Sequence, residues 1–149
     1  MKRLGPILLA EDNLNDVELT LAALKQNHIA NEVVVARDGQ EALDYLYRRG
    51  NFQKREAGHP VVVFLDLKMP KVDGLEVLRQ MKSDATIKMI PVVMLTSSRE
   101  ENDLVRSYSL GANAYVVKPV GFEQFLDAVR QLGIFWAVLN EPPPVTNND

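Results

Sequence analysis

Acidic, hydroxyl and basic residues follow short apolar runs at four places in this sequence. The runs are residues 7–10, 61–65, 91–95 and 114–117, and the residues that follow them are Glu11 with Asp12, Asp66, Thr96 and Lys118. If the runs are neighbouring parallel strands, their carboxyl ends meet at one edge of a sheet, where open α/β sheets bind ligands. Three carboxylates, a hydroxyl and an ammonium at that edge would form a cation site beside an anion site of phosphoryl size. The spacing therefore indicates phosphoryl chemistry.

The three carboxylates favour a magnesium site. Ionised carboxylates that lie close together repel each other unless a cation is present, and Mg²⁺ takes oxygen ligands and bridges to phosphate. A plainer interpretation of Glu11 and Asp12 is an acidic start to the following helix, and Asp66 has a similar one as a strand-end cap. Lys118 is harder to explain as a solvated residue, because it ends an apolar strand and Pro119 follows it.

Strand-like and helix-like segments alternate along the whole chain. Residues 32–36 are expected to form a further strand, and helical spacing of apolar residues follows each strand-like segment. Five helices are expected. The first carries Leu14–Leu24, the second begins at Asp38-Gly39 and the third begins at Asp73-Gly74. The fourth spans about Glu100–Leu110, and the last runs from Phe122 towards Asn140. Five such units predict a parallel sheet with helices on both faces. Residues 50–60 lack periodicity and are expected to form a long polar loop.

Composition limits the possible functions. The 149 residues fit one domain, which we place at residues 1–140 with no output domain, followed by a mobile proline-rich tail at residues 141–149. A net charge of −3 offers no basic field for nucleic acid or an anionic membrane. The lack of cysteine fits the cytoplasm, and no apolar run approaches the length of a membrane span. Motifs for dinucleotide binding, P-loop hydrolases and serine hydrolases are missing.

At these residues the chain resembles the receiver domain of two-component response regulators. The matching motifs stand in the family's order between residues 5 and 130. They are Leu8–Asn13, Leu65–Pro70, Asp73-Gly74, Leu95–Ser97 and Tyr115–Pro119. The resemblance implies a flavodoxin-like fold, a doubly wound five-stranded parallel sheet in the order 2-1-3-4-5 with five helices. It also implies a phosphoacceptor that assists its own phosphorylation and dephosphorylation, and not an enzyme with a separate substrate.

The resemblance also implies a role for each residue at the sheet edge. Asp66 would accept the phosphoryl group from a histidine kinase. The Mg²⁺ ligands would be Asp12, Asp66 and the backbone carbonyl of Lys68, with Glu11 acting through a bound water. Thr96 would donate its hydroxyl and Lys118 would pair with the phosphoryl group. Tyr115 would turn inward as Thr96 moves, changing the face formed by the fourth helix, fifth strand and fifth helix. The plainer interpretation of Tyr115 is ordinary sheet packing.

Within the family the likeness is closest to the small regulators of bacterial phytochrome histidine kinases. These share the polar insertion before the third strand and the Phe135-Trp136 pair. The expected partner is therefore a phytochrome-type kinase, with a downstream protein or phosphotransfer partner beyond it.

Apolar residues at helical period continue past the sheet to Phe135, Trp136 and Leu139. They predict an extended last helix and a homodimer, because aromatic residues are favoured at interfaces. The alternative is that they fold back over their own domain.

Three rival functions remain at this point. A pseudo-receiver would bind partners without taking phosphate, which the intact residue set disfavours. A flavodoxin-like cofactor binder would share the topology. A phosphatase of the haloacid-dehalogenase type is disfavoured, because Asp66-Leu67-Lys68 lacks the second aspartate that such enzymes use as an acid.

Overall fold

The computed structural model describes residues 5–26, 28–97, 106–118 and 120–133. Its central element is a five-stranded sheet in the order β2-β1-β3-β4-β5, and every pairing is parallel. The strands are β1 (Ile7–Ala10), β2 (Val33–Ala36), β3 (Val62–Asp66), β4 (Val92–Thr96) and β5 (Ala114–Val117). The helices are α1 (Leu14–Gln26), α2 (Gly39–Tyr47), α3 (Gly74–Ser83) and α5 (Phe122–Leu132), with a short 3₁₀ helix, η1 (Gly50–Phe52). The predicted doubly wound, flavodoxin-like topology is confirmed.

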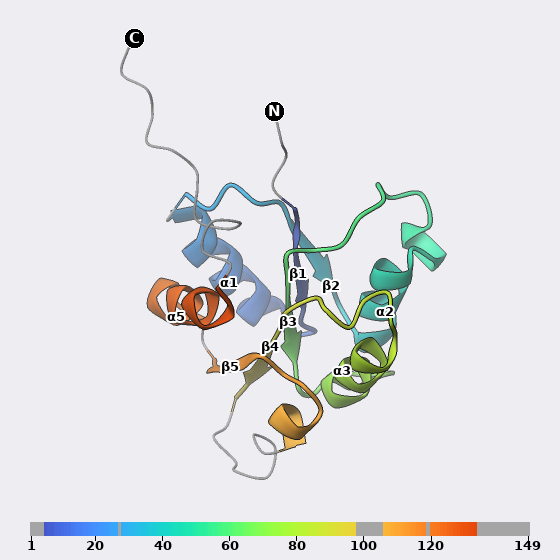
Figure 1. Ribbon diagram of the computed structural model, residues 1–149. Helices are drawn as coiled ribbons and strands as arrows, with labels where there is room; N and C mark the ends of the chain where they lie inside the picture. Colours follow the sequence, from blue (N-terminus) through green and yellow to red (C-terminus); the bar gives the residue numbers. More distant parts are fainter. Residues whose placement is uncertain (1–4, 27, 98–105, 119, 134–149) are drawn as a thin grey trace.

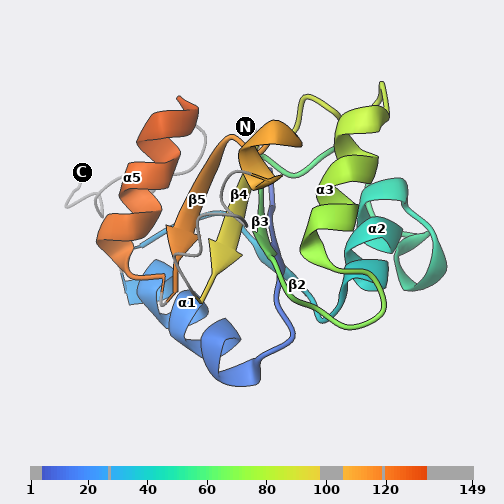
Figure 2. The same ribbon diagram turned by 90° about the horizontal axis from the view of Figure 1, so that it is seen from below.

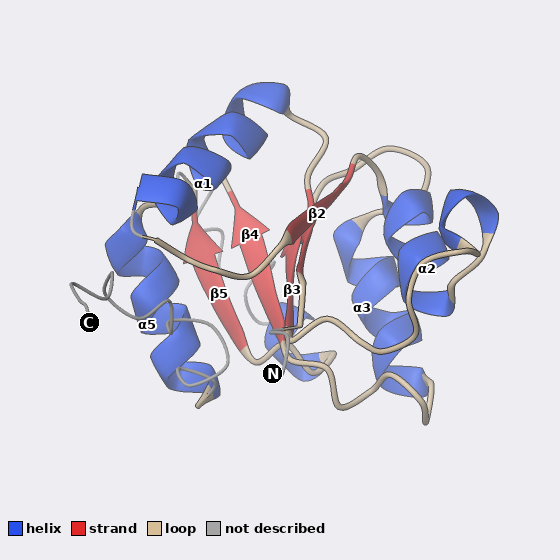
Figure 3. Cartoon of the chain, turned by 90° about the horizontal axis from the view of Figure 1, so that it is seen from above, coloured by secondary structure: helices blue, strands red, loops and turns tan. Residues whose placement is uncertain are grey.

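Helices cover both faces of the sheet (Figures 1 and 3). On one face, α1 and α5 pack over alternate strand residues, and the Phe64 and Phe125 rings stack with their centroids 5.6 Å apart. On the other face, α2 and α3 enclose a second core. Because both faces are covered, β1, β3 and β4 are buried along their whole length. This explains why these strands appear in the sequence as continuous apolar runs.

Aspartates fix where α2 and α3 begin. The carboxylate of Asp38 accepts the backbone N–H of Glu41, and that of Asp73 accepts the backbone N–H of Glu76. Each carboxylate thereby satisfies a donor that the first helical turn leaves unpaired. Gly74, the first residue of α3, approaches the end of β3 very closely, because a Cβ placed there would lie 2.0 Å from the carbonyl oxygen of Asp66. Only glycine allows this contact.

The register brings the predicted site residues to one edge. Ala10 of β1 pairs with Leu65 of β3, so the residues after them, Glu11 and Asp66, lie side by side at the edge of the sheet. On the other side of β3, Thr96 of β4 pairs with Val117 of β5, and Lys118 follows directly. Figure 2 shows β3, β4 and β5 running in the same direction towards this edge. The predicted convergence is therefore present.

The last helix differs from the sequence prediction. We expected it to continue towards Asn140, but α5 ends at Leu132. Gly133 adopts a left-handed conformation (φ 69°) and its N–H bonds to the carbonyl oxygens of Arg130 and Val129. This is a helix stop, which the apolar periodicity through residue 139 concealed. Phe135, Trp136, Leu139 and the tail at residues 141–149 lie outside the described residues.

Two other segments were predicted in outline. Of the helix expected over Glu100–Leu110, the structure describes residues 106–109 as helical, and residues 98–105 lie outside the description. The polar segment 50–60 contains η1 and is organised by Arg55. The Arg55 side chain donates to the carbonyl oxygens of Tyr45, Glu56 and Gly58, and its guanidinium lies 4.1 Å from the centroid of the Tyr45 ring.

Among the described residues, none of the helices combines the length and hydropathy that crossing a membrane requires.

Candidate functional site

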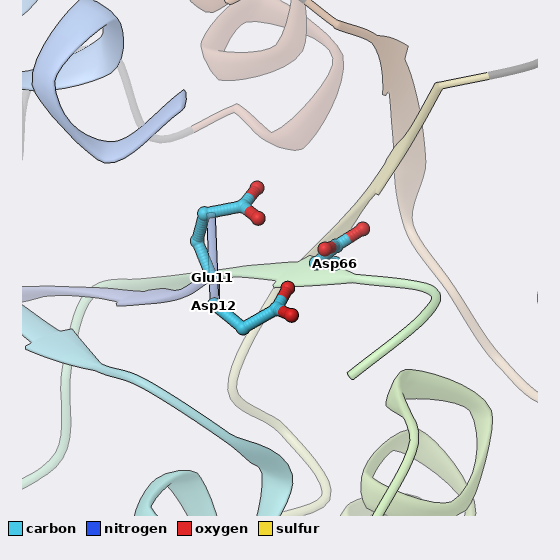
Figure 4. A group of neighbouring side chains, drawn as sticks. All are labelled: Glu11, Asp12 and Asp66. Carbon is cyan, nitrogen blue, oxygen red and sulfur yellow. The ribbon is translucent and has the colours of Figure 1, made fainter. Parts of the chain in front are cut away.

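Three carboxylates converge at the ends of β1 and β3 (Figure 4). One oxygen each from Glu11, Asp12 and Asp66 lie within 4.8 Å of one another. Glu11 and Asp66 are buried, at 1% and 6% exposure, whereas Asp12 is open to solvent. Oxygen donors in a half-open group of this kind suit a hard divalent cation that retains some of its waters. The three carboxylates that were predicted to serve the metal site are therefore brought together, and the predicted role of the Lys68 carbonyl remains a prediction.

Lys118 lies beside this acidic group. Its Nζ is 2.8 Å from Glu11 Oε1 and 3.2 Å from Asp66 Oδ2. The side chain is only 11% exposed, so the pairs are little screened by water. The ammonium thus balances part of the charge of two buried carboxylates.

Burial and charge change the acidity of both partners. Burial and the neighbouring carboxylate of Glu11 raise the pKa of Asp66 to about 7, although Lys118 opposes the rise. Burial by itself would lower the pKa of Lys118, but its pairs with Glu11, Asp66 and Asp16 raise that pKa above the ordinary value of a lysine. Lys118 therefore remains charged, while Asp66 is poised between its protonated and ionised forms near neutral pH. A cation bound to Asp66 would favour the ionised form.

The other predicted residues lie on β4, on β5 and in the loop after β3. Thr96 is buried at the end of β4, and its carbonyl oxygen accepts the backbone N–H of Lys118. Tyr115 of β5 is half-buried, and its ring meets that of Tyr108 edge to face at 5.7 Å. Lys68 lies in the loop after β3 with an exposed side chain. The predicted roles of these three residues remain predictions.

Local hydrogen bonds orient the start of the site. Glu11 Oε2 accepts the backbone N–H of Asn13, and Asn13 Oδ1 accepts the backbone N–H of Asp16. Arg37 donates to the backbone carbonyl oxygen of Asp12. The turn between β1 and α1 is thereby fixed, so Glu11 points into the site while Asn13 caps the helix.

Asp16 was not predicted as a site residue. Its Oδ2 lies 3.1 Å from Lys118 Nζ, and its side chain is 26% exposed. The sequence offered no specific signal for this contact, because an acid in the first turn of a helix is ordinarily explained by the helix dipole.

Comparison with known proteins decides the family. The model of the response regulator receiver domain matches residues 7–130. The chain belongs to this family. Response regulator Rcp1 from Synechocystis is 37% identical over 130 residues, which cover 87% of each protein. The probable methanogenesis regulatory protein FilR2 from Methanothrix harundinacea is 39% identical over 140 residues, covering 92% of this chain and 86% of FilR2.

Solved structures of bacteriophytochrome response regulators are also similar. AtBRR is 64% identical with a TM-score of 0.87, covering 94% of this chain and all of that one. RtBRR is 63% identical with a TM-score of 0.85, covering 95% of this chain and 86% of that one. The Mn²⁺-bound form of Rcp1 is 34% identical with a TM-score of 0.73, covering 97% of this chain and 99% of that one. A receiver of the phytochrome-regulator type is therefore the identity that the comparisons support.

Proposed function

We propose that this protein is a response regulator that accepts a phosphoryl group on Asp66 from a phytochrome-type histidine kinase. The observation that carries the proposal is the geometry around Asp66. Its carboxylate lies at the open edge of the sheet, with Glu11 and Asp12 within 4.8 Å and Lys118 Nζ at 3.2 Å. Phosphoryl transfer depends mainly on positioning and charge neutralisation, and this arrangement supplies both.

The transfer step follows from these positions. A carboxylate oxygen of Asp66 attacks the phosphorus of the kinase phosphohistidine. An O–P bond forms as the P–N bond breaks, and the bonding electron pair stays on the imidazole nitrogen. Lys118 neutralises negative charge on the transferred group, because its ammonium already lies beside Asp66.

We propose Mg²⁺ as the cation of the acidic group. The carboxylates of Asp12 and Asp66 and the backbone carbonyl of Lys68 would hold it, with Glu11 acting through a water. When bound, Mg²⁺ supplies charge neutralisation between the acceptor carboxylate and the phosphoryl oxygens. All these donors are oxygens, which is the chemistry that Mg²⁺ prefers.

Signal output follows from the same site. The backbone N–H of Lys118 donates to the carbonyl oxygen of Thr96. A phosphoryl group that engages both side chains would therefore act on the ends of β4 and β5 together. Tyr115 lies on β5 against Tyr108, which the structure places in the helical segment 106–109. A change at the site would therefore reach the surface through these two rings, which a downstream partner would read.

Phosphotransfer from a purified phytochrome-type kinase tests the proposal. Wild-type protein should take labelled phosphate from the kinase histidine only when Mg²⁺ is present, and Asp66→Asn should abolish uptake. Asp127→Asn is the matched control, because Asp127 is an exposed aspartate on α5. Failure of the wild type to take phosphate from either the kinase or acetyl phosphate would instead support a pseudo-receiver. A coloured, flavin-containing protein would support the cofactor-binding alternative.

A further inference from the structure

Lys118 has more carboxylate partners than the proposed phosphoryl chemistry requires. Its ammonium contacts Glu11 at 2.8 Å, Asp16 at 3.1 Å and Asp66 at 3.2 Å. Of these three contacts, the one with Asp16 Oδ2 also meets hydrogen-bond geometry, so Asp16 engages one of the three N–H donors of the ammonium. A phosphoryl group on Asp66 therefore competes with Asp16 for the direction and the charge of that ammonium.

Asp16 is the partner that can leave at least cost. Glu11 is 1% exposed, and its other oxygen accepts the backbone N–H of Asn13. Asp66 carries the phosphoryl group itself. The Asp16 side chain is 26% exposed, so water can replace the ammonium as its partner with little loss of solvation. Asp16 is also the one of the three that lies outside the group proposed to hold the cation.

An ordinary structural role does not account for the direction of the Asp16 side chain. An acidic residue in the first turn of a helix favours that helix through its dipole, and Asp16 occupies the first turn of α1. However, its carboxylate contacts a lysine 102 residues away in sequence. The N-terminal cap of α1 is supplied by Asn13, which accepts the backbone N–H of Asp16. The side chain of Asp16 is thus committed to Lys118.

We propose that Asp16 is a positioning residue that restrains the Lys118 ammonium and competes with the phosphoryl group for it. In the unphosphorylated protein, Asp16 holds one N–H of Lys118 and neutralises part of its charge. Phosphorylation transfers that N–H to a phosphoryl oxygen and releases Asp16 to solvent. Asp16 therefore weakens the attraction of the site for the phosphoryl group and sets the threshold for activation. This inference rests on the proposed function of Asp66 and deepens it.

Beryllofluoride, a stable phosphoryl mimic, provides the probe. Binding of beryllofluoride in the presence of Mg²⁺ would be titrated by NMR for wild type and for Asp16→Asn. The variant keeps the shape of the side chain, removes its charge and leaves the backbone N–H bonded to Asn13. Removing a competitor of this partly exposed kind should tighten binding about three- to tenfold. Asp16→Glu, which retains the charge, should return binding towards the wild-type value.

The matched control is Glu18→Gln. Glu18 lies on the same helix, is exposed, and has no ion pair with the described residues, so this change removes the same charge without touching Lys118. It should leave beryllofluoride binding at the wild-type value. Equal tightening in Glu18→Gln and Asp16→Asn would show a general charge effect and overturn the inference.

A double-mutant cycle tests whether Asp16 acts through Lys118. In a Lys118→Ala background, Asp16→Asn should no longer change the affinity for beryllofluoride. Tightening that persists in this background, or wild-type or weaker binding by Asp16→Asn alone, would overturn the inference. The proposed function fails differently, because in that case the wild type itself would not bind beryllofluoride with Mg²⁺.

Discussion

The surroundings of Asp66 disfavour its ionised form, although its proposed role as phosphoacceptor requires an ionised carboxylate. Burial and Glu11 raise its pKa to about 7, while Lys118 lowers it. In the absence of a divalent cation, a proton on Asp66 relieves this opposition near and below neutral pH. A cation bound at the carboxylates would replace the proton and would leave Asp66 ionised for its proposed attack on phosphorus.

The raised pKa of Asp66 predicts a pH-dependent cost in stability. Asp66 binds its proton more tightly in the folded chain than in the unfolded one, so stability falls as the pH rises from about 4 to about 7. Without divalent cations, Asp66→Asn should therefore be more stable than wild type at pH 8, by about 1–3 kcal/mol. The gain should shrink towards pH 4, and urea unfolding at several pH values measures it. A difference that does not vary with pH would contradict this explanation, and Asp127→Asn serves as the exposed control.

Replacing Lys118 should separate Mg²⁺ binding from the response to beryllofluoride. Lys118→Ala removes the ammonium but none of the proposed metal ligands, so Mg²⁺ binding should persist. The response to beryllofluoride should weaken, because the charge that links the phosphoryl group to the end of β5 is lost. NMR shifts at Thr96 and Tyr115 report the response. Wild-type shifts in the variant would mean that Lys118 has only a structural role.

At the scale of elements, the sheet edge was predictable, whereas the contact of Asp16 and the end of α5 were not. Buried parallel strands appear as apolar runs, so their ends at Glu11, Asp66 and Lys118 could be located from sequence alone. Asp16 was missed because an acid near a helix start has an ordinary explanation, and the contact with Lys118 depends on tertiary packing. The predicted end of the last helix was wrong, because the period of apolar residues says nothing about the backbone conformation at Gly133.

The close contact between α3 and β3 predicts that adding one methyl group at Gly74 strongly lowers the stability of the fold. In Gly74→Ala the new Cβ would lie 2.0 Å from the carbonyl oxygen of Asp66, so α3 must move away from the acceptor strand. Unfolding free energy should fall by about 2 kcal/mol or more, as for other overpacked sites. Gly121→Ala is the control, because a Cβ there meets only the flexible end of the Gln124 side chain. Urea unfolding of both variants measures the difference, and equal losses would contradict the packing argument.

At the scale of the whole molecule, we propose a homodimer formed through Phe135, Trp136 and Leu139. These residues lie outside the described part of the chain, and the proposal rests on the run of large apolar side chains that they form after α5. Phe135→Ala/Trp136→Ala should shift the protein to monomer in sedimentation velocity. Met89→Ala, at an apolar side chain 82% exposed elsewhere on the surface, should not. A wild-type protein that is monomeric at high micromolar concentration, with and without beryllofluoride, would contradict the proposal.

The central claim is that Asp66 carries the phosphoryl group, and chemical mapping of the modified residue tests it most directly. Protein phosphorylated by acetyl phosphate with Mg²⁺ would be reduced with borohydride, which converts an aspartyl phosphate to homoserine, and then analysed by peptide mass spectrometry. We predict homoserine at position 66 alone, and none when Mg²⁺ is chelated before phosphorylation. Homoserine at another aspartate with position 66 unchanged, or no conversion anywhere in the wild type, would contradict the account.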